Sequence, residues 1–154
     1  MRIRVIAVGT RMPAWVDAAV QDYLRRLPRE LAVSIEAIKP AVHRDDALAV
    51  INDEGKRLLQ RAAGSTRLIM LDERGVGWST AELARQLEQW QQQALDVALL
   101  VGGADGHSAE VRAAAHEGWS LSALTLPHAL VRVVIVEQIY RAQSMLRGHP
   151  YHRA

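Results

Sequence analysis

The hydrophobic positions of this chain follow two spacings that alternate from one end to the other. Five short segments are continuously apolar or alternate with polar residues, which is typical of strands. Between them lie segments whose apolar residues recur at helical spacing. The predicted strands are Arg2–Val8, Leu31–Ile38, Leu68–Leu71, Val97–Val101 and Trp119–Leu121. The predicted helices run from Pro13 to Pro28, over residues 45–62, from Ser79 past Trp90, from Ser108 to about His116, and from Leu130 to Arg147.

Strands that alternate with helices predict an α/β domain with a mostly parallel sheet flanked by helices. The 154 residues contain no internal repeat or linker, so we expect a single domain over residues 1–154. In such sheets, ligands bind beyond the carboxyl ends of the strands. Those ends are Leu71–Asp72, Gly102–Gly103 and the loop after Leu121, and their convergence predicts the ligand site.

The last predicted helix carries two apolar stripes instead of one. The narrower stripe consists of Val133, Val136 and Tyr140. A helix that covers one core needs a single stripe, so two stripes indicate two packing partners. The second partner is either another part of the same domain or a second subunit, and we expect the second subunit. The broader stripe consists of Val131, Val134, Ile135, Ile139, Ala142, Met145 and Leu146.

Two loops at the strand ends bear on the chemistry. The glycine-rich run 102–106 follows a strand and precedes a helix, but it lacks both the dinucleotide and the triphosphate-binding spacings. A tight turn that lets a ligand approach the backbone, or a plain loop turn, fits it better. The segment Ser122–Leu126 offers backbone polar groups and an apolar wall, which suits an adenine with a thioether or sulfonium. An ordinary buried loop explains its composition equally well.

Composition excludes several classes of protein. The chain has no cysteine, which rules out disulfides and thiolate chemistry and suits a cytoplasmic protein. We expect no membrane-spanning helix, because no apolar run is long enough. We expect no metal site, because His116, His149 and His152 lack the spacing of metal ligands. The net charge of +2 permits a nucleic-acid partner without requiring one.

Several motifs together resemble the RlmH family, which belongs to the SPOUT class of methyltransferases. The resemblance spans nearly the whole chain, and the terminal motif is highly specific. One departure is the loop at residues 40–44, which is less basic than the family's. The motifs are Ala-Val-Gly-Thr-Arg-Met-Pro (7–13), Tyr-Leu-Arg-Arg (23–26), Val-Gly-Gly-Ala-Asp-Gly (101–106), Trp-Ser-Leu-Ser-Ala-Leu-Thr-Leu-Pro-His (119–128), Leu-Val-Arg-Val (130–133) and His-Pro-Tyr-His-Arg (149–153).

This resemblance implies a function and a site. Members of the family use S-adenosylmethionine to methylate N3 of a pseudouridine in 23S ribosomal RNA, acting as homodimers on assembled ribosomes. The implied fold has a C-terminal trefoil knot, which the usual rules of chain topology disfavour. The implied cofactor-binding residues lie at the three strand ends described above: Leu71, Gly102, Leu121, Ser122, Ala123, Leu124, Thr125 and Leu126.

The C-terminal tail provides the candidate catalytic residues. Tyr151 could stack on a base, Arg153 could hold a phosphate or the base oxygens, and His152 could accept the N3 proton. Because the tail follows an expected interface helix, it could complete the pocket of a partner subunit. Two alternatives remain open: a nonenzymatic RNA-binding module with a degenerate pocket, and a SPOUT enzyme that acts on transfer RNA.

Overall fold

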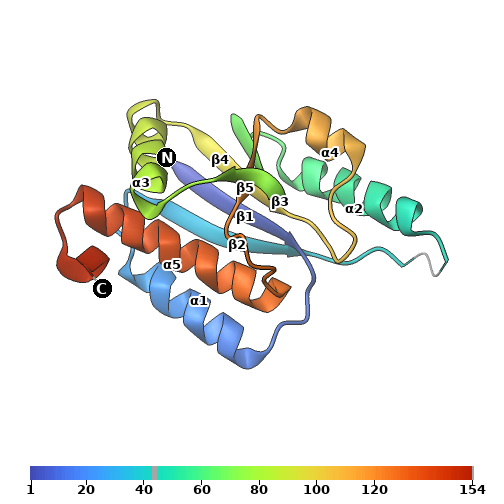
Figure 1. Ribbon diagram of the computed structural model, residues 1–154, viewed down its shortest axis with the longest axis horizontal. Coiled ribbons are helices and arrows are strands. Elements are labelled where there is room, and N and C mark those ends of the chain that lie inside the picture. Colours follow the sequence, from blue (N-terminus) through green and yellow to red (C-terminus); the bar gives the residue numbers. More distant parts are fainter. Residues whose placement is uncertain (43–44, 154) are drawn as a thin grey trace.

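The computed structural model describes residues 1–42 and 45–153, so His43 and Arg44 of the 40–44 loop lie outside the described residues. Its centre is a five-stranded sheet in the order β2-β1-β4-β3-β5, and every strand pair is parallel (Figure 1). The prediction of an α/β fold with a parallel sheet is confirmed. The strands are β1 (Arg2–Val8), β2 (Ala32–Ile38), β3 (Arg67–Gly77), β4 (Asp96–Val101) and β5 (Glu117–Ser120). The helices are α1 (Ala14–Arg26), α2 (Ala47–Arg61), α3 (Thr80–Gln92), α4 (Ala109–Ala114), α5 (His128–Leu146) and the 3-10 helix η1 (Pro150–Arg153).

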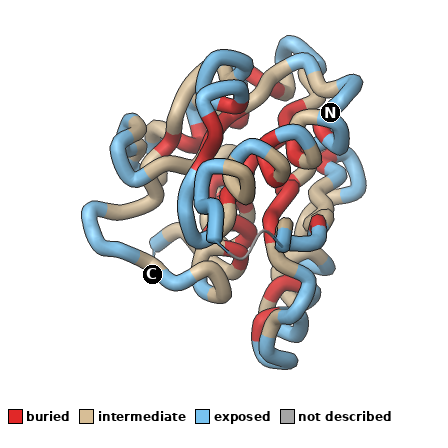
Figure 2. The backbone as a smooth tube through the Cα atoms, turned by 90° about the vertical axis from the view of Figure 1, so that its right-hand side faces the viewer, coloured by how far each residue is buried: buried red, intermediate tan, exposed pale blue. Residues whose placement is uncertain are grey.

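Helices cover both faces of the sheet. Helices α1, α5 and α3 lie on one face, and α2 and α4 lie on the other (Figure 1). Alternate residues of β4 therefore enter different cores: Leu99 packs with α3 and α5, whereas Leu100 packs with α2 and α4. This two-sided burial is the reason that the central strands are continuously apolar. Figure 2 shows the buried segments gathered in the interior, with exposed loops around them.

Strand β3 is longer than the sequence predicts. The expected strand ended at Leu71, but β3 continues to Gly77 and pairs again with β5 after an irregularity between Leu71 and Val76. A Cβ atom at Gly75 would lie 2.5 Å from the backbone carbon of Gly118. Glycine is therefore required where these two strands approach closely, and the prediction of a loop here was wrong.

The sequence predicted the starts of the helices more accurately than the end of β3. The predicted helix starts at Ser79 and Ser108 are confirmed: Ser79 and Glu82 form a capping box at the start of α3, and the Ser108 hydroxyl caps α4. Gly55 does not interrupt α2. A Cβ atom there would lie 2.2 Å from the hydroxyl oxygen of Ser108, so this glycine allows α2 and α4 to pack closely.

Helix α5 has two partners within its own chain. Its broad stripe faces the sheet and α3, and its narrow stripe faces α1. Val136 is fully buried with Val16 and Val20 of α1, and the ring of Tyr140 lies 6.0 Å from that of Tyr23. The interpretation of a helix buried on two sides of one domain therefore explains the narrow stripe. The homodimer and the trefoil knot stay predictions. Within the part of the chain that the structure describes, no helix is long and apolar enough to cross a membrane.

We predict that Val136→Ala weakens the protein without changing its oligomeric state. The substitution removes two buried methyl groups between α1 and α5, which costs about 2 kcal/mol in the free energy of unfolding. Urea unfolding measures the loss, and sedimentation measures the assembly. Wild-type stability combined with altered sedimentation would instead place Val136 in a subunit interface.

Candidate functional site

A cavity of about 650 Å³ opens between residues 71–74 of β3, the ends of β4 and β5 and the start of α5. Every predicted cofactor-binding residue except Ala123 lines it, which unites the three strand ends as the sequence predicted. Ala123 belongs to the same loop but is exposed and is not part of the lining. The predicted residues that line the cavity are Leu71, Gly102, Leu121, Ser122, Leu124, Thr125 and Leu126.

The glycine-rich run is a tight turn beside the cavity. The amide of Gly106 donates to the carbonyl of Gly103 at 3.1 Å, and Gly106 has a positive φ of +88°. A Cβ atom at Gly102 would lie 3.1 Å from the carbonyl oxygen of Gly106 and 3.2 Å from a ring carbon of His107. A larger residue at position 102 would therefore press against the Gly106 backbone and the His107 ring, so the packing of this turn favours glycine there. Close approach of a ligand to this turn stays a prediction.

His107 fixes this turn to the neighbouring strand, and sequence reasoning missed it. Its Nε2–H donates to the carbonyl of Leu71 at 3.0 Å, and the side chain is almost completely buried. Burial lowers the pKa of His107, and nearby Arg112 acts in the same direction. The ring is therefore neutral at physiological pH, and it positions the glycine turn and the end of β3 relative to each other.

Hydrogen bonds within the loop after β5 stabilise its conformation. The hydroxyl of Ser120 donates to the carbonyl of Ser122 at 3.1 Å, and the amide of Leu124 donates to the hydroxyl of Ser122 at 2.9 Å. These hydrogen bonds pair polar groups of Ser120, Ser122 and Leu124 with one another within the loop. Leu121 and Leu126 add apolar lining to the cavity.

An ion pair borders the same cavity. A carboxylate oxygen of Asp72 lies 2.5 Å from Nη1 of Arg112, and the other accepts from the backbone amide of Arg74 at 3.2 Å. Burial acts to raise the pKa of Asp72, but the hydrogen bonds and positive charges of Arg112 and Arg74 outweigh it and the pKa is lowered. Asp72 is therefore a carboxylate at neutral pH. The pairing was invisible in the sequence, because its partners are forty residues apart.

The predicted catalytic tail lies at the opposite end of α5 from this cavity (Figure 1). Helix α5 has 19 residues and is therefore about 28 Å long. The cavity is lined by His128 and Val131 at its start, whereas Tyr151, His152 and Arg153 follow its end. Within one subunit, the tail and the cofactor cavity do not form one site.

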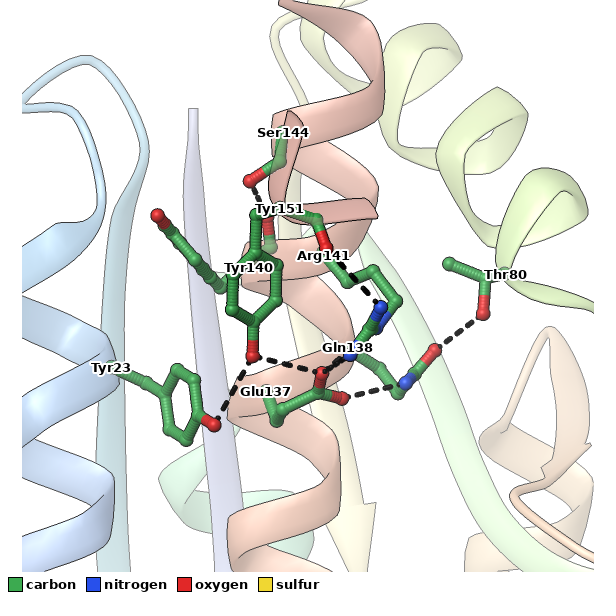
Figure 3. Close-up of polar contacts among 8 residues, drawn as sticks. All are labelled: Tyr23, Thr80, Glu137, Gln138, Tyr140, Arg141, Ser144 and Tyr151. Atoms are coloured by element: carbon green, nitrogen blue, oxygen red, sulfur yellow. Dashed lines mark hydrogen bonds and ion pairs between the residues drawn. The ribbon is translucent and has the colours of Figure 1, made fainter. Parts of the chain in front are cut away.

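The tail is ordered by a polar and aromatic cluster (Figure 3). The Tyr151 hydroxyl lies 3.2 Å from both the Tyr23 hydroxyl and a carboxylate oxygen of Glu137. Its ring lies 4.6 Å from the ring of Tyr140, and the Arg141 guanidinium lies 4.8 Å from its centre. Burial, the Tyr23 hydroxyl and the charge of Glu137 raise the pKa of Tyr151. Its phenol therefore stays protonated at neutral pH, and the tail is held against α5.

Comparison with known proteins identifies the class of this fold and site. Residues 1–152 match the family described as predicted SPOUT methyltransferases, so the chain belongs to that family. A solved structure of a putative methylase family protein from Neisseria gonorrhoeae superposes with a TM-score of 0.54 at 17% identity, covering 90% of this chain and 81% of the other. That likeness supports the fold alone.

Proteins of similar sequence identify a more specific family within this class. The chain is 51% identical to a ribosomal RNA large subunit methyltransferase H from Thioalkalivibrio sulfidiphilus, with 99% of each chain covered. It is 46% identical to the protein of the same name from Methylococcus capsulatus, with 99% of this chain and 100% of that one covered. The chain therefore belongs to the ribosomal RNA large subunit methyltransferase H family, as the motifs indicated.

Members of the SPOUT class take their methyl group from S-adenosylmethionine, and the cavity fits this cofactor. Its volume lies within the range of small-molecule sites. Leu71, Leu121, Leu124 and Leu126 give its lining an apolar part that suits an adenine. Among the described residues, no group of three or more histidine or acidic side chains has a geometry that could hold a metal ion.

We predict that Thr125→Trp weakens cofactor binding and that Ala123→Trp does not. Both residues are exposed, but Thr125 lines the cavity, so an indole there would occupy the ligand's space, whereas Ala123 lies outside the lining. The affinity for S-adenosylmethionine, measured by calorimetry, should fall at least tenfold in the first variant, which is about 1.4 kcal/mol. Equal affinities in both variants would remove this loop wall from the binding site.

Proposed function

We propose that this protein uses S-adenosylmethionine to methylate N3 of a pseudouridine in 23S ribosomal RNA, on assembled ribosomes in the cytoplasm. The observation that carries the proposal is the near-complete alignment with ribosomal RNA large subunit methyltransferases H at 46–51% identity. The cofactor cavity at the carboxyl edge of the sheet gives this proposal a physical location.

The chemistry depends mainly on positioning. Methylation of N3 forms an N–C bond as the bond between the methyl carbon and sulfur breaks, and the N3 proton passes to a base or to water. Such an in-line displacement needs the nitrogen held close to the methyl carbon and in line with it. The cofactor supplies an activated methyl group when it is bound. The residues of the cavity orient that group and exclude water, and a second group must hold the base.

We assign that second group to the tail of a partner subunit in a homodimer. The length of α5 keeps a subunit's own tail away from its own cavity, so a single chain lacks part of the active site. The Tyr151 hydroxyl is engaged with Tyr23 and Glu137, which makes Tyr151 the anchor of the tail. Arg153 is exposed at its tip. In this arrangement, His152 accepts the N3 proton or bonds the base, and Arg153 holds a phosphate or a base oxygen.

The direct experiment starts with ribosomes from cells that lack the protein. Purified protein and S-adenosylmethionine are added to these ribosomes, to free 23S RNA and to transfer RNA, and the digested nucleosides are analysed by mass spectrometry. We expect one new methyl group on a pseudouridine of 23S RNA, with ribosomes as the better substrate. Methylation of transfer RNA would favour the alternative SPOUT substrate. Binding of RNA without cofactor binding or methyl transfer would favour a nonenzymatic module.

We predict that deletion of residues 149–154 abolishes methyl transfer but preserves the fold and most cofactor affinity. Residues 149–153 follow the end of α5 away from the cavity, and they contact α5 and Tyr23 of α1. Circular dichroism and calorimetry with S-adenosylmethionine provide the controls. A fully active deletion variant would exclude a catalytic role for the tail.

A mixed dimer separates the two possible positions of the tail. Subunits lacking 149–154 are combined with Thr125→Trp subunits, so that one intact cavity and one intact tail remain on different chains. Recovery of some activity on mixing is expected if the tail acts in trans. Mixed dimers that form but stay inactive would show that each tail serves its own subunit.

A further inference from the structure

The Asp72–Arg112 ion pair is a feature of the cavity that the fold does not need for its core. Both residues line the cavity, and their side chains remain 13% and 36% exposed. Arg112 lies on α4, and Asp72 lies in β3 at the irregularity between Leu71 and Val76. A partly exposed ion pair contributes little to stability, so its position calls for another explanation.

The guanidinium of Arg112 has more N–H donors than its hydrogen bond to Asp72 uses. It carries five N–H donors, and among the residues that the structure describes its hydrogen-bond acceptor is Asp72, through Nη1. Asp72 fixes the orientation of this group, and its own two oxygens are already used by Arg112 and by the amide of Arg74. The remaining donors of a held guanidinium at a cavity wall suit a planar carboxylate.

The charges of the pair favour a zwitterion over a polyanion. A phosphate that approached Arg112 would also meet the carboxylate of Asp72, with Glu73 and Asp105 on the same lining. An α-amino acid carries a carboxylate and an ammonium on one carbon. Adjacent positive and negative groups can therefore both be matched, the carboxylate by Arg112 and the ammonium by the acidic side.

From this geometry we propose that Arg112, held by Asp72, binds the α-carboxylate at the amino-acid end of S-adenosylmethionine. The inference rests on the proposed use of that cofactor in this cavity. Under this proposal the cofactor site has two parts. The glycine turn and the loop after β5 hold the adenosine, and the ion pair sets the direction in which the amino-acid arm leaves it.

The test compares two ligands that differ in the amino-acid arm. S-Adenosylhomocysteine and 5′-methylthioadenosine share the adenosine and the thioether, but only the first carries the α-amino acid. Calorimetry gives the affinity of each for the wild type and for Arg112→Met. In the variant, S-adenosylhomocysteine should bind at least tenfold more weakly, about 1.4 kcal/mol, whereas the affinity for 5′-methylthioadenosine should change less than about twofold.

Two further variants complete the design. Arg112→Lys keeps the charge but loses the planar fork, so its loss for S-adenosylhomocysteine should be smaller, about threefold. Arg85→Met removes an exposed arginine of α3 outside the cavity lining and should change neither affinity. Retained binding of 5′-methylthioadenosine also shows that each variant is folded. If Arg112→Met does not fold, Arg112→Lys decides the question by the same comparison of ligands.

Different outcomes overturn different statements. Equal loss of both ligands in the Arg112 variants would give Arg112 a structural role and overturn the inference, as would unchanged affinity for both. If the Arg112 variants distinguish S-adenosylhomocysteine from 5′-methylthioadenosine as the wild type does but bind ribosomes more weakly, Arg112 contacts an RNA phosphate instead. A wild-type protein that binds neither ligand would contradict the proposed function itself.

Discussion

The parallel direction of all five strands is the constraint on which the rest of this structure depends. Parallel strands require a crossover for each connection, and these crossovers cover both faces of the sheet with helices. Residues 71–74 of β3 and the loops that follow β4 and β5 therefore lie at a single edge. Residues of the segments 71–74, 101–107 and 120–126 line one cavity there.

This constraint explains how much of the fold and the site could be predicted. Strands buried on both faces are continuously apolar, so β1 and β4 were found almost to the residue. The cofactor loops followed from the strand ends, and family motifs supplied the rest. The close approach at Gly75 and the burial of His107 depend on tertiary contacts, and a single sequence carries no signal for them. The same holds for the pairing of Asp72 with Arg112.

Helix α5 shows why a pattern can be interpreted correctly and still leave its partner undetermined. Two apolar stripes do mean two packing surfaces, and α5 has them. Periodicity gives the width and direction of a stripe, but it does not identify the element that covers it. Helix α1 precedes α5 by a hundred residues, and it packs beside α5 because both cross the same face of the sheet (Figure 1).

The tail at the other end of α5 is also held by packing against helices of its own chain. Disorder is the usual state of a chain terminus, and ordering a disordered segment at a binding site costs conformational entropy. Here Tyr151 already fixes the tail through Tyr23, Tyr140 and Glu137, so that cost is met when the chain folds and not when the substrate binds (Figure 3). The anchor is formed by residues of α5 and α1. In the dimer that we propose, this anchor preorganises Arg153 and His152 for a target outside their own subunit, because α5 separates them from their own cavity.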